Sequence, residues 1–481
     1  MSLPRLCRAV FLDKARLNDT MGGNAKRQEE LPMVRSRVTS MTSGSIFRQL
    51  ISFSIPLMLG NLFQLSYNMV DTIVIGRFVG STALAAVGTC DQIMSLLILG
   101  VSGVCIGASV LMGNFFGAGK REKLLAEMKT TVSLGLLFAL VVMALGLPLT
   151  GTIFSLMQVQ PEALPEAQTY LRIIFLALPF TCLYNIYAAA LRSVGDSRTP
   201  VRYLILSCVL NMGLDLLLVA GLHLGVLGAA LATMAAQGIS ALLCILYVYR
   251  QVPLLHFSAR SLRIDRALAR QTLSLGGLTA LQQCSQPIGN IIIQGSVNTL
   301  GITSAAAFSA ARKIEDIGLL PGRSISNAIT TFTAQNEGAL NHERTEKGFR
   351  KAMLLECLSG IVVSAIVLLL RGPLMGIFST DSDMIREGLR YFGVIGFCYT
   401  LPCITNGIQG YFRGMKLMLP SLLATLTQIS VRVLFTLWLV PRIGIPGVGI
   451  ACVAGWTAMT LWTLPYRRIW LSRKGRNMGG E

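Results

Sequence analysis

Apolar residues along this chain are gathered into long runs, which are separated by short polar segments. A helix needs roughly 20 such residues to cross a bilayer, and the runs reach that length. The chain lacks the ten-residue segments of alternating hydrophobicity that are typical of an outer-membrane barrel. Because only helices and closed barrels span a bilayer, the pattern predicts an all-α polytopic membrane protein.

The apolar runs and the polar segments between them predict twelve transmembrane helices. Each helix end is placed to within about four residues. The helices fall in two groups of six. The first six cover residues 48–75, 84–112, 125–150, 168–190, 201–221 and 226–249. The second six cover residues 271–296, 302–333, 352–370, 387–410, 419–440 and 446–466.

Basic residues orient these helices, because Lys and Arg are retained on the cytoplasmic side of a membrane. Of the 42 Lys and Arg, 32 lie in the two terminal segments and in the loops after the even-numbered spans. Both termini are therefore predicted to be cytoplasmic. The basic residues that this topology retains in the cytoplasm, where they attract anionic membrane lipid, account for the net charge of +19. No nucleic-acid partner is required to explain it.

The same polar segments predict the domain boundaries. Residues 1–45 read as a disordered cytoplasmic tail, and Met41 is a second candidate for the start of translation. An amino-terminal six-helix lobe then covers residues 46–250, and a basic cytoplasmic linker covers residues 251–270. The carboxy-terminal six-helix lobe covers residues 271–466, and a basic cytoplasmic tail covers residues 467–481.

The two halves resemble one another at an offset near 221 residues. Matching landmarks occur in the same order and on the same kind of loop, which indicates duplication of a six-helix unit. An even number of helices gives both halves one orientation, so the lobes are related by an axis along the membrane normal, with a cavity between them. The paired landmarks are Gly117 with Gly338, Asn185 with Asn406, Arg192 with Arg413, and residues 225–232 with residues 444–451.

Several chemistries are disfavoured by residue type. All eleven cysteines except Cys7 fall in apolar runs without a CxxC pair, so they read as small buried residues rather than as zinc ligands or disulfides. The chain has only three histidines and no HExxH, GxSxG or Walker motif, which argues against a membrane-embedded enzyme and against an ATP-driven pump.

Five motifs resemble those of the multidrug and toxic compound extrusion transporters, and the resemblance covers roughly residues 46–470. It implies a monomeric secondary antiporter in the cytoplasmic (inner) membrane, which exports amphipathic, often cationic, drugs and toxic compounds by alternating access. It implies no cofactor beyond the coupling ion, H⁺ or Na⁺. The motifs are YNMVDTIVIGRFVG from Tyr67, GAGK from Gly117, LRSVGDSRTP from Leu191, NMGLD from Asn211 and GVLGAALAT from Gly225.

Asp71 is the acid of the first motif, and it lies among Val, Ile and Met. An ionised Asp in mid-membrane costs about 2.5 to 3.5 kcal/mol, and such residues persist where they line a cavity or bind an ion. Asn211 and Asp215 are four residues apart, so they share a helix face. The repeat places apolar or sulfur side chains opposite all four polar residues: Asp71 faces Ile292, Asn211 faces Val431, Asp215 faces Phe435 and Thr233 faces Cys452.

By resemblance, Asp71, Asn211, Asp215 and Thr233 form the cation site of the amino lobe. Their oxygens suit Na⁺, and two close carboxylates suit a proton. The alternative for the two acids is a hydrated helix end, and for the amide and the hydroxyl it is a bond between helices.

The same helix face predicts part of the substrate cavity. Gln64, Tyr67 and Asn68 precede Asp71 by seven, four and three residues, so they lie on or near its face, although they could equally pack against neighbouring spans. Pro56 interrupts the first span and is the predicted hinge.

A different export function stays open from sequence alone, a flippase for a lipid-linked saccharide. Such a protein is expected to line its cavity with several basic residues for phosphate. Only four basic residues lie inside the spans, and Arg312 can pair with Glu315 or Asp316 on its own helix. Those four are Arg312, Lys313, Arg323 and Arg432.

Overall fold

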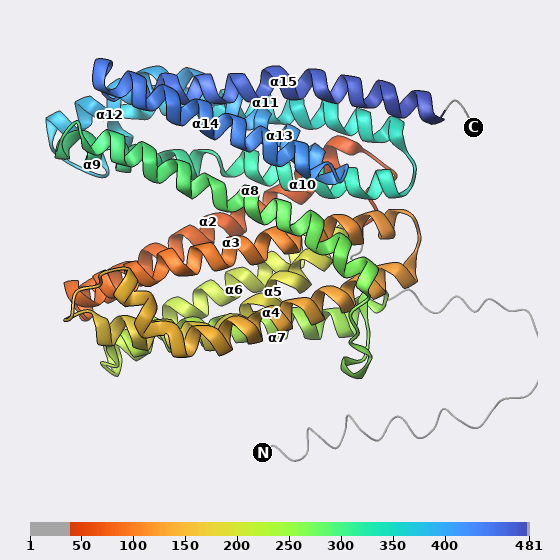
Figure 1. Cartoon of the computed structure of the whole chain (residues 1–481), viewed down its shortest axis with the longest axis horizontal. Helices are drawn as coiled ribbons and strands as arrows, with labels where there is room; N and C mark the ends of the chain where they lie inside the picture. The colour runs from red at the N-terminus through yellow and green to blue at the C-terminus, as the bar shows by residue number, and fades with distance from the viewer. Residues whose placement is uncertain (1–38, 479–481) are drawn as a thin grey trace, which may run out of the picture. The chain divides into compact units, whose positions relative to one another are not determined.

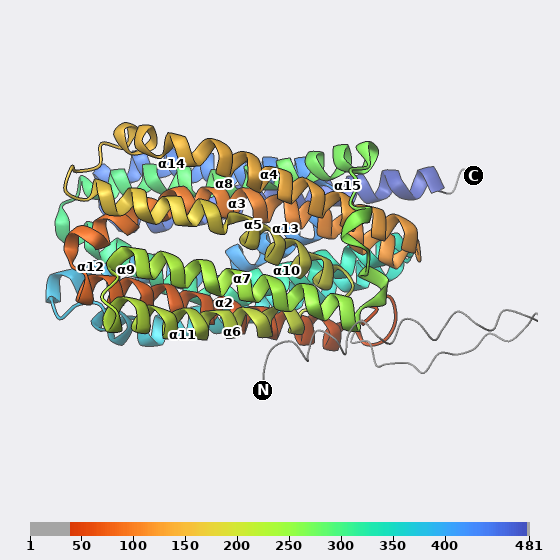
Figure 2. The same ribbon diagram turned by 90° about the horizontal axis from the view of Figure 1, so that it is seen from below.

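The computed structural model describes residues 39–478, with side chains described as far as residue 472. Within that range the chain is helical with short connections (Figures 1 and 2). The first helices are α2 (Ile46–Phe78), α3 (Ser81–Gly117), α4 (Arg121–Leu156), α5 (Leu164–Ser193), α6 (Arg198–Asp215), the π-helix η1 (Leu216–Gly221) and α7 (Gly225–Gln251). The others are α8 (Arg266–Asn298), α9 (Ile302–Gly318), α10 (Leu320–Gly338), α11 (His342–Gly376), α12 (Ser382–Ile395), α13 (Thr400–Gly414), α14 (Met418–Ile443) and α15 (Pro446–Met478).

Long apolar helices dominate this part of the chain, so the predicted multi-pass membrane protein is confirmed. Among the described residues, nine helices are long and apolar enough to cross a membrane, and the bent pair of Ser382–Cys398 with Thr400–Gly414 makes a tenth candidate. The twelve-span count needs α8 as well as α9 with α10, which are more polar, and it stays a prediction.

Two predicted spans are divided in two. Residues 387–410 were expected to form one helix, but α12 ends at Ile395 and α13 begins at Thr400, with a bend of 51° at the break. Residues 302–333 were expected to form one helix, but α9 ends at Gly318 and α10 begins at Leu320. Pro321 explains the break, because its ring disfavours helical backbone at the preceding residue and its missing N–H suits a first helical turn. The second piece is polar, yet almost all of its residues from Ser324 to Asn336 are buried.

The helices pack as two lobes, which we call the amino lobe (α2 to α7) and the carboxy lobe (α8 to α15). In Figure 1 the orange and yellow helices of the amino lobe group apart from the green and blue helices of the carboxy lobe. The lobes meet where α3 packs on α8 and α10, and where α2 packs on α10. Small residues allow this contact, because a Cβ added at Gly107 would lie 2.5 Å from the backbone of Gly276.

At one end of the helices the lobes touch through a reciprocal pair of glycines. A Cβ on Gly117 would lie 1.9 Å from the carbonyl oxygen of Gln335, and a Cβ on Gly338 would lie 2.0 Å from that of Asn114. Both glycines and both carbonyls are related by 221 residues, which is the offset of the predicted duplication. Only a residue without a side chain permits this approach of α3 to α10.

We call this end the basic end, because it carries the basic connections from α3 to α4, from α5 to α6 and from α10 to α11. The segment before α2 lies across it. The backbone N–H of Met41 donates to Oε1 of Gln335 at 2.8 Å, and the Arg344 guanidinium donates to the backbone carbonyls of Met41, Ser43 and Gly44. Residues 39–45 of the predicted tail are therefore ordered against both lobes.

The structure describes only part of the two predicted terminal tails. Residues 1–38 and 479–481 lie outside the described part of the chain. Helix α15 continues from the carboxy lobe through residues 467–478, where a basic tail was predicted.

Candidate ion-binding site

Asp71 lies on α2, and its side chain is half-buried. Its Oδ1 is shielded from solvent and has no hydrogen-bond partner within residues 39–472. A shielded carboxylate oxygen without a partner is costly unless something binds it. This atom therefore marks Asp71 as a candidate ligand.

Asn211, Asp215 and Thr233 form a second part of the site. Asn211 and Asp215 are both buried on α6, and Thr233 lies opposite on α7. With the Asn211 amide oriented to satisfy both of its ends, its nitrogen donates to Oδ2 of Asp215 at 3.2 Å and its oxygen accepts from the Thr233 backbone N–H at 3.2 Å. Asn211 thus joins the acid of α6 to α7, as the shared helix face predicted.

The backbone widens directly after Asp215. Helix α6 ends at this residue and continues as the π-helix Leu216–Gly221. Single π-helical turns inside α-helices occur frequently at functional sites. Oδ1 of Asp215 is buried, and no partner for it is found in the described part of the chain.

Asp71 and Asp215 lie within electrostatic range of each other, so the structure brings the two predicted acids together. Asp91 of α3 also interacts with Asp71. Two tyrosines surround the acids: Tyr67 is within range of Asp71, Asp91 and Asp215, and Tyr170 of α5 is within range of Asp71 and Asp91. We call these residues, with Asn211 and Thr233, the amino-lobe cluster.

Tyr170 and Asp91 are the members of this cluster that were not predicted as site residues. Gln64 and Asn68 are exposed on α2, and their place in a substrate cavity stays a prediction. Pro56 lies inside α2, which is continuous from Ile46 to Phe78.

The acids of the amino-lobe cluster do not converge as a metal-ligand group. Within residues 39–478, no three His, Cys, Asp or Glu side chains lie close enough together to hold a metal ion. A coupling Na⁺ would therefore need the amide of Asn211 and the hydroxyl of Thr233 beside the carboxylates. Such neutral oxygens are suitable ligands for a hard cation.

The carboxy lobe has a buried charge cluster of its own. Glu315 of α9 accepts hydrogen bonds from the hydroxyls of Tyr391 (2.9 Å) and Tyr399 (3.2 Å), and it pairs with Arg312 at 3.8 Å. The ion pair predicted from the i,i+3 spacing is therefore present. Glu315 also lies within electrostatic range of Arg432, a buried residue of α14.

The sequence indicated no partner for Arg432 on its own helix. It donates to Oδ1 of Asn290 on α8 at 3.1 Å, while its Nε is buried and finds no acceptor among the residues described. Two guanidiniums thus surround one carboxylate. We call Arg312, Glu315, Tyr391, Tyr399 and Arg432 the carboxy-lobe cluster.

The two clusters occupy corresponding places in the repeat but carry opposite charge. Tyr391 and Arg312 follow Tyr170 and Asp91 by 221 residues. The amino-lobe cluster is built around acids, whereas the carboxy-lobe cluster has more bases than acids. Duplication therefore preserved the position of a polar centre while its chemistry diverged.

Among the buried carboxylates outside the clusters, Glu127 and Glu356 were not predicted in any role. Glu127 of α4 accepts from the hydroxyls of Thr131 and of Thr272, and so joins α4 to α8. Glu356 of α11 is fully buried between Gly322 and Gly407, and neither of its oxygens has a partner in the described structure.

Comparison with known protein families decides the identity of the fold. The MatE family model matches residues 56–217 and, a second time, residues 279–438. The chain belongs to this family. Because one model matches each half, the comparison also agrees with the duplication. MatE proteins are membrane-embedded secondary transporters, so the chain is a transporter and not an enzyme.

Relatives in the family span nearly the whole chain. The probable multidrug resistance protein YoeA of Bacillus subtilis is 27% identical over 441 residues, which cover 89% of this chain and 95% of the relative. The FAD transporter of Shewanella oneidensis is 26% identical over 372 residues, covering 76% of this chain and 80% of the relative.

A solved structure shows the same fold. It is described as an outward-facing conformation of a multidrug resistance MATE family transporter. It superposes with a TM-score of 0.85 at 22% identity, and the match covers 91% of this chain and 98% of that one.

Proposed function

We propose that this MatE protein is a cation-coupled antiporter of the cytoplasmic (inner) membrane, which exports amphipathic, often cationic, drugs by alternating access. In this proposal twelve spans cross the membrane, and the basic end with both termini faces the cytoplasm. H⁺ or Na⁺ is the coupling ion. Drugs as the substrate class are supported by relatives such as YoeA, which is described as a probable multidrug resistance protein.

The observation that carries the proposal is the pair of Asp71 and Asp215. They lie on different helices within electrostatic range, and each has one shielded oxygen without a hydrogen-bond partner in the part that the structure describes. A cation bound there removes the repulsion between α2 and α6, so it stabilises one arrangement of the amino lobe. A drug that prefers the other arrangement is released when the ion binds.

Alternating access is supported by the contact between the lobes at the basic end. Helices α3 and α10 meet there through Gly117 and Gly338, and the side chain of Gln335 reaches the backbone of α5. In the proposed orientation this state is closed to the cytoplasm. The fold similarity to an outward-facing transporter is consistent with that assignment.

Dye efflux from membrane vesicles, driven separately by a pH gradient and by a Na⁺ gradient, tests the proposal. We expect one gradient to drive wild-type efflux, and Asp71→Asn to lose it while folded protein remains in the membrane. Asp383→Asn is the matched control, because it makes the same change at an exposed acid outside both clusters. Efflux by Asp71→Asn at the wild-type rate would contradict the proposal.

A second candidate substrate class is favoured by the carboxy-lobe cluster. In this cluster the positive charges of Arg312 and Arg432 outnumber the negative charge of Glu315. Arginine is the side chain best suited to bind carboxylate or phosphate. A relative of this chain is described as an FAD transporter. An anionic compound is therefore the alternative cargo, and competition of flavin dinucleotide with dye efflux distinguishes the two classes.

A further inference from the structure

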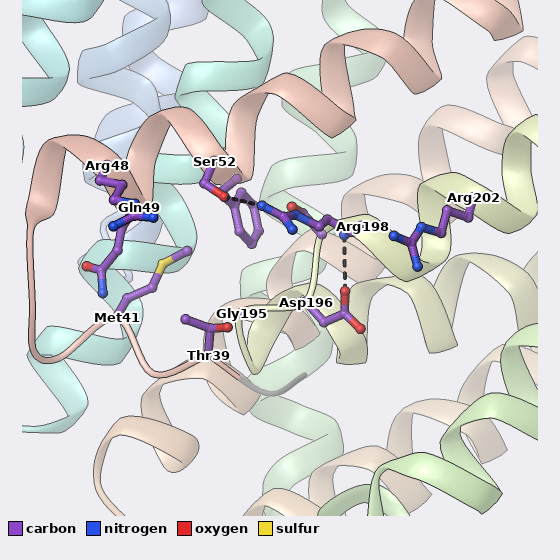
Figure 3. Close-up of a pocket in the computed structure, with 11 residues that line it drawn as sticks. Thr39, Met41, Arg48, Gln49, Ser52, Gly195, Asp196, Arg198 and Arg202 are labelled. Carbon is purple, nitrogen blue, oxygen red and sulfur yellow. Dashed lines mark hydrogen bonds between the residues drawn. The ribbon is translucent and has the colours of Figure 1, made fainter. Parts of the chain in front are cut away.

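A cavity of about 410 Å³ opens at the basic end, between the start of α2 and the start of α6 (Figure 3). It lies outside both charge clusters and apart from the proposed ion site. Its walls come from the segment before α2, from the first turns of α2 and from the loop that leads into α6. Its lining includes Arg48, Ser52, Asp196, Arg198 and Arg202.

Three guanidiniums give this cavity its chemistry: those of Arg48, Arg198 and Arg202. All three residues are exposed, and within residues 39–472 none of them forms an ion pair. Arg198 donates to Oγ of Ser52 at 2.8 Å and so joins α6 to α2.

The one acid in the cavity wall is engaged elsewhere. Oδ1 of Asp196 accepts the backbone N–H groups of Arg198 and Thr199, and its Oδ2 accepts the Tyr247 hydroxyl at 3.3 Å. The carboxylate thus holds the start of α6 in place. Positive charge exceeds negative charge in the cavity by three groups to one, so its polar part is suited to an anion.

An apolar groove continues directly from the cavity. It encloses about 580 Å³, and it shares Arg48, Ser52 and Arg198 with the basic cavity. Phe47 and Ile55 on its walls are 40% and 47% exposed. Its other lining residues are Ile51 and Pro56.

We propose that the cavity and the groove together bind one anionic phospholipid. The phosphodiester lies among the three arginines, and an acyl chain occupies the groove along α2. A ligand of this site must be anionic at one end and apolar at the other, which a free phosphate ion is not. The basic end is also where a cytoplasmic leaflet rich in anionic lipid would lie.

This site goes beyond the proposed transport activity, because it assigns a lipid to the outside of the amino lobe. The groove contains Pro56, the predicted hinge of α2, and the arginine that joins α6 to α2. A bound lipid would therefore hold the starts of α2 and α6 together and stabilise this arrangement of the amino lobe.

Purified full-length protein in an uncharged detergent tests the site. Native mass spectrometry counts bound lipid, and thermal unfolding is followed with phosphatidylglycerol, phosphatidylcholine or inorganic phosphate added. We expect phosphatidylglycerol alone to bind with one-to-one stoichiometry and to raise the unfolding midpoint. Changing Arg48, Arg198 and Arg202 to Gln together should weaken its binding by about tenfold or more.

Two further variants separate the site from general surface charge. Changing Arg260, Arg263 and Arg266 to Gln removes the same charge from exposed residues of the connection to α8, and should leave the binding unchanged. Ile55→Trp fills the groove with all arginines intact, and should also weaken phosphatidylglycerol binding.

Three outcomes overturn the lipid assignment. Equal protection by inorganic phosphate would show a site for free anions. An equal loss of phosphatidylglycerol binding in both triple-arginine variants would show general charge attraction without a specific site. Unchanged binding in Ile55→Trp would show that no acyl chain lies in the groove. None of these outcomes bears on cation-driven efflux, which is measured separately.

Discussion

The side-chain amide of Gln335 on α10 donates a hydrogen bond of 2.8 Å to the backbone carbonyl of Ser193 at the end of α5. The oxygen of the same amide accepts the backbone N–H of Met41. One fully buried side chain of the carboxy lobe therefore holds both the amino lobe and the segment that precedes α2. Closure of the basic end depends on this amide as well as on the glycine contacts.

Gln335→Leu should open the basic end. The change leaves a buried carbonyl and a buried N–H without partners, and each costs about 1 to 3 kcal/mol. Amide hydrogen exchange is the measurement, and we expect faster exchange in residues 118–120 and 339–341. Gln294→Leu is the control, because the one side-chain hydrogen bond of Gln294 within residues 39–472 goes to exposed Asn298 on its own helix. Equal exchange in wild type and Gln335→Leu would contradict this role.

Gly117→Ala should separate α3 from α10. Its new methyl group would lie 1.9 Å from the carbonyl oxygen of Gln335, so the backbones must move apart, at a cost of about 1 to 3 kcal/mol. We expect a severalfold loss of dye efflux together with faster exchange at the basic end. Gly100→Ala on the same helix adds its methyl group to open space and should behave as wild type.

Apolar periodicity and basic-residue placement predicted most of the fold. The helices and their division into two lobes follow from long apolar runs and one repeat offset. The same offset relates Gly117 to Gly338, but their contacts with the opposite lobe were not predicted. The breaks after Gly318 and after Ile395 were missed, because the spans were read from the order of apolar and polar segments and not from local backbone geometry. Such local backbone geometry overrides hydropathy.

The candidate site was predicted in part. Asn211 and Asp215 share a helix face as their spacing suggested, and Asn211 reaches Thr233, which only the family resemblance had placed there. Asp71 lies within electrostatic range of Asp215. Tyr170 could not be found in the same way, because a lone tyrosine in an apolar run reads as packing. The offset between Tyr170 and Tyr391 was the one available signal. Arg432 was unexplained because its partners, Asn290 and Glu315, lie on other helices.

Asn211→Ala should weaken cation coupling without abolishing transport. The amide joins Asp215 to the backbone of Thr233, and hydrogen bonds to charged groups contribute about 1.5 to 3 kcal/mol. The cation concentration at half-maximal efflux should therefore rise by about tenfold or more. The measurement is efflux rate against pH and against Na⁺ concentration. Thr72→Val serves as control, since that hydroxyl bonds only within α2, and an unshifted Asn211→Ala curve would remove Asn211 from the site.

Glu315→Gln should destabilise the carboxy lobe. The change removes the carboxylate that Arg312 and Arg432 share, and only Arg312 keeps another acid, Asp316, within electrostatic range. Breaking a buried pair typically costs about 3 to 5 kcal/mol. Thermal unfolding in detergent measures the loss. The neighbouring Asp316→Asn is the matched control, because Asp316 pairs with Arg323 where both side chains are more than 40% exposed, and such pairs contribute about 1 kcal/mol or less.

A double-mutant cycle separates the charge effect from packing. If Glu315 stabilises the lobe by balancing guanidiniums, the combined Glu315→Gln and Arg312→Gln protein should be more stable than Glu315→Gln alone. Additive losses would instead show that the tyrosine hydrogen bonds, not the charge balance, account for the effect. The cycle also bears on cargo: because the surplus guanidinium is the feature that favours an anionic substrate, Arg432→Gln should lower competition by flavin dinucleotide and leave cationic dye efflux intact.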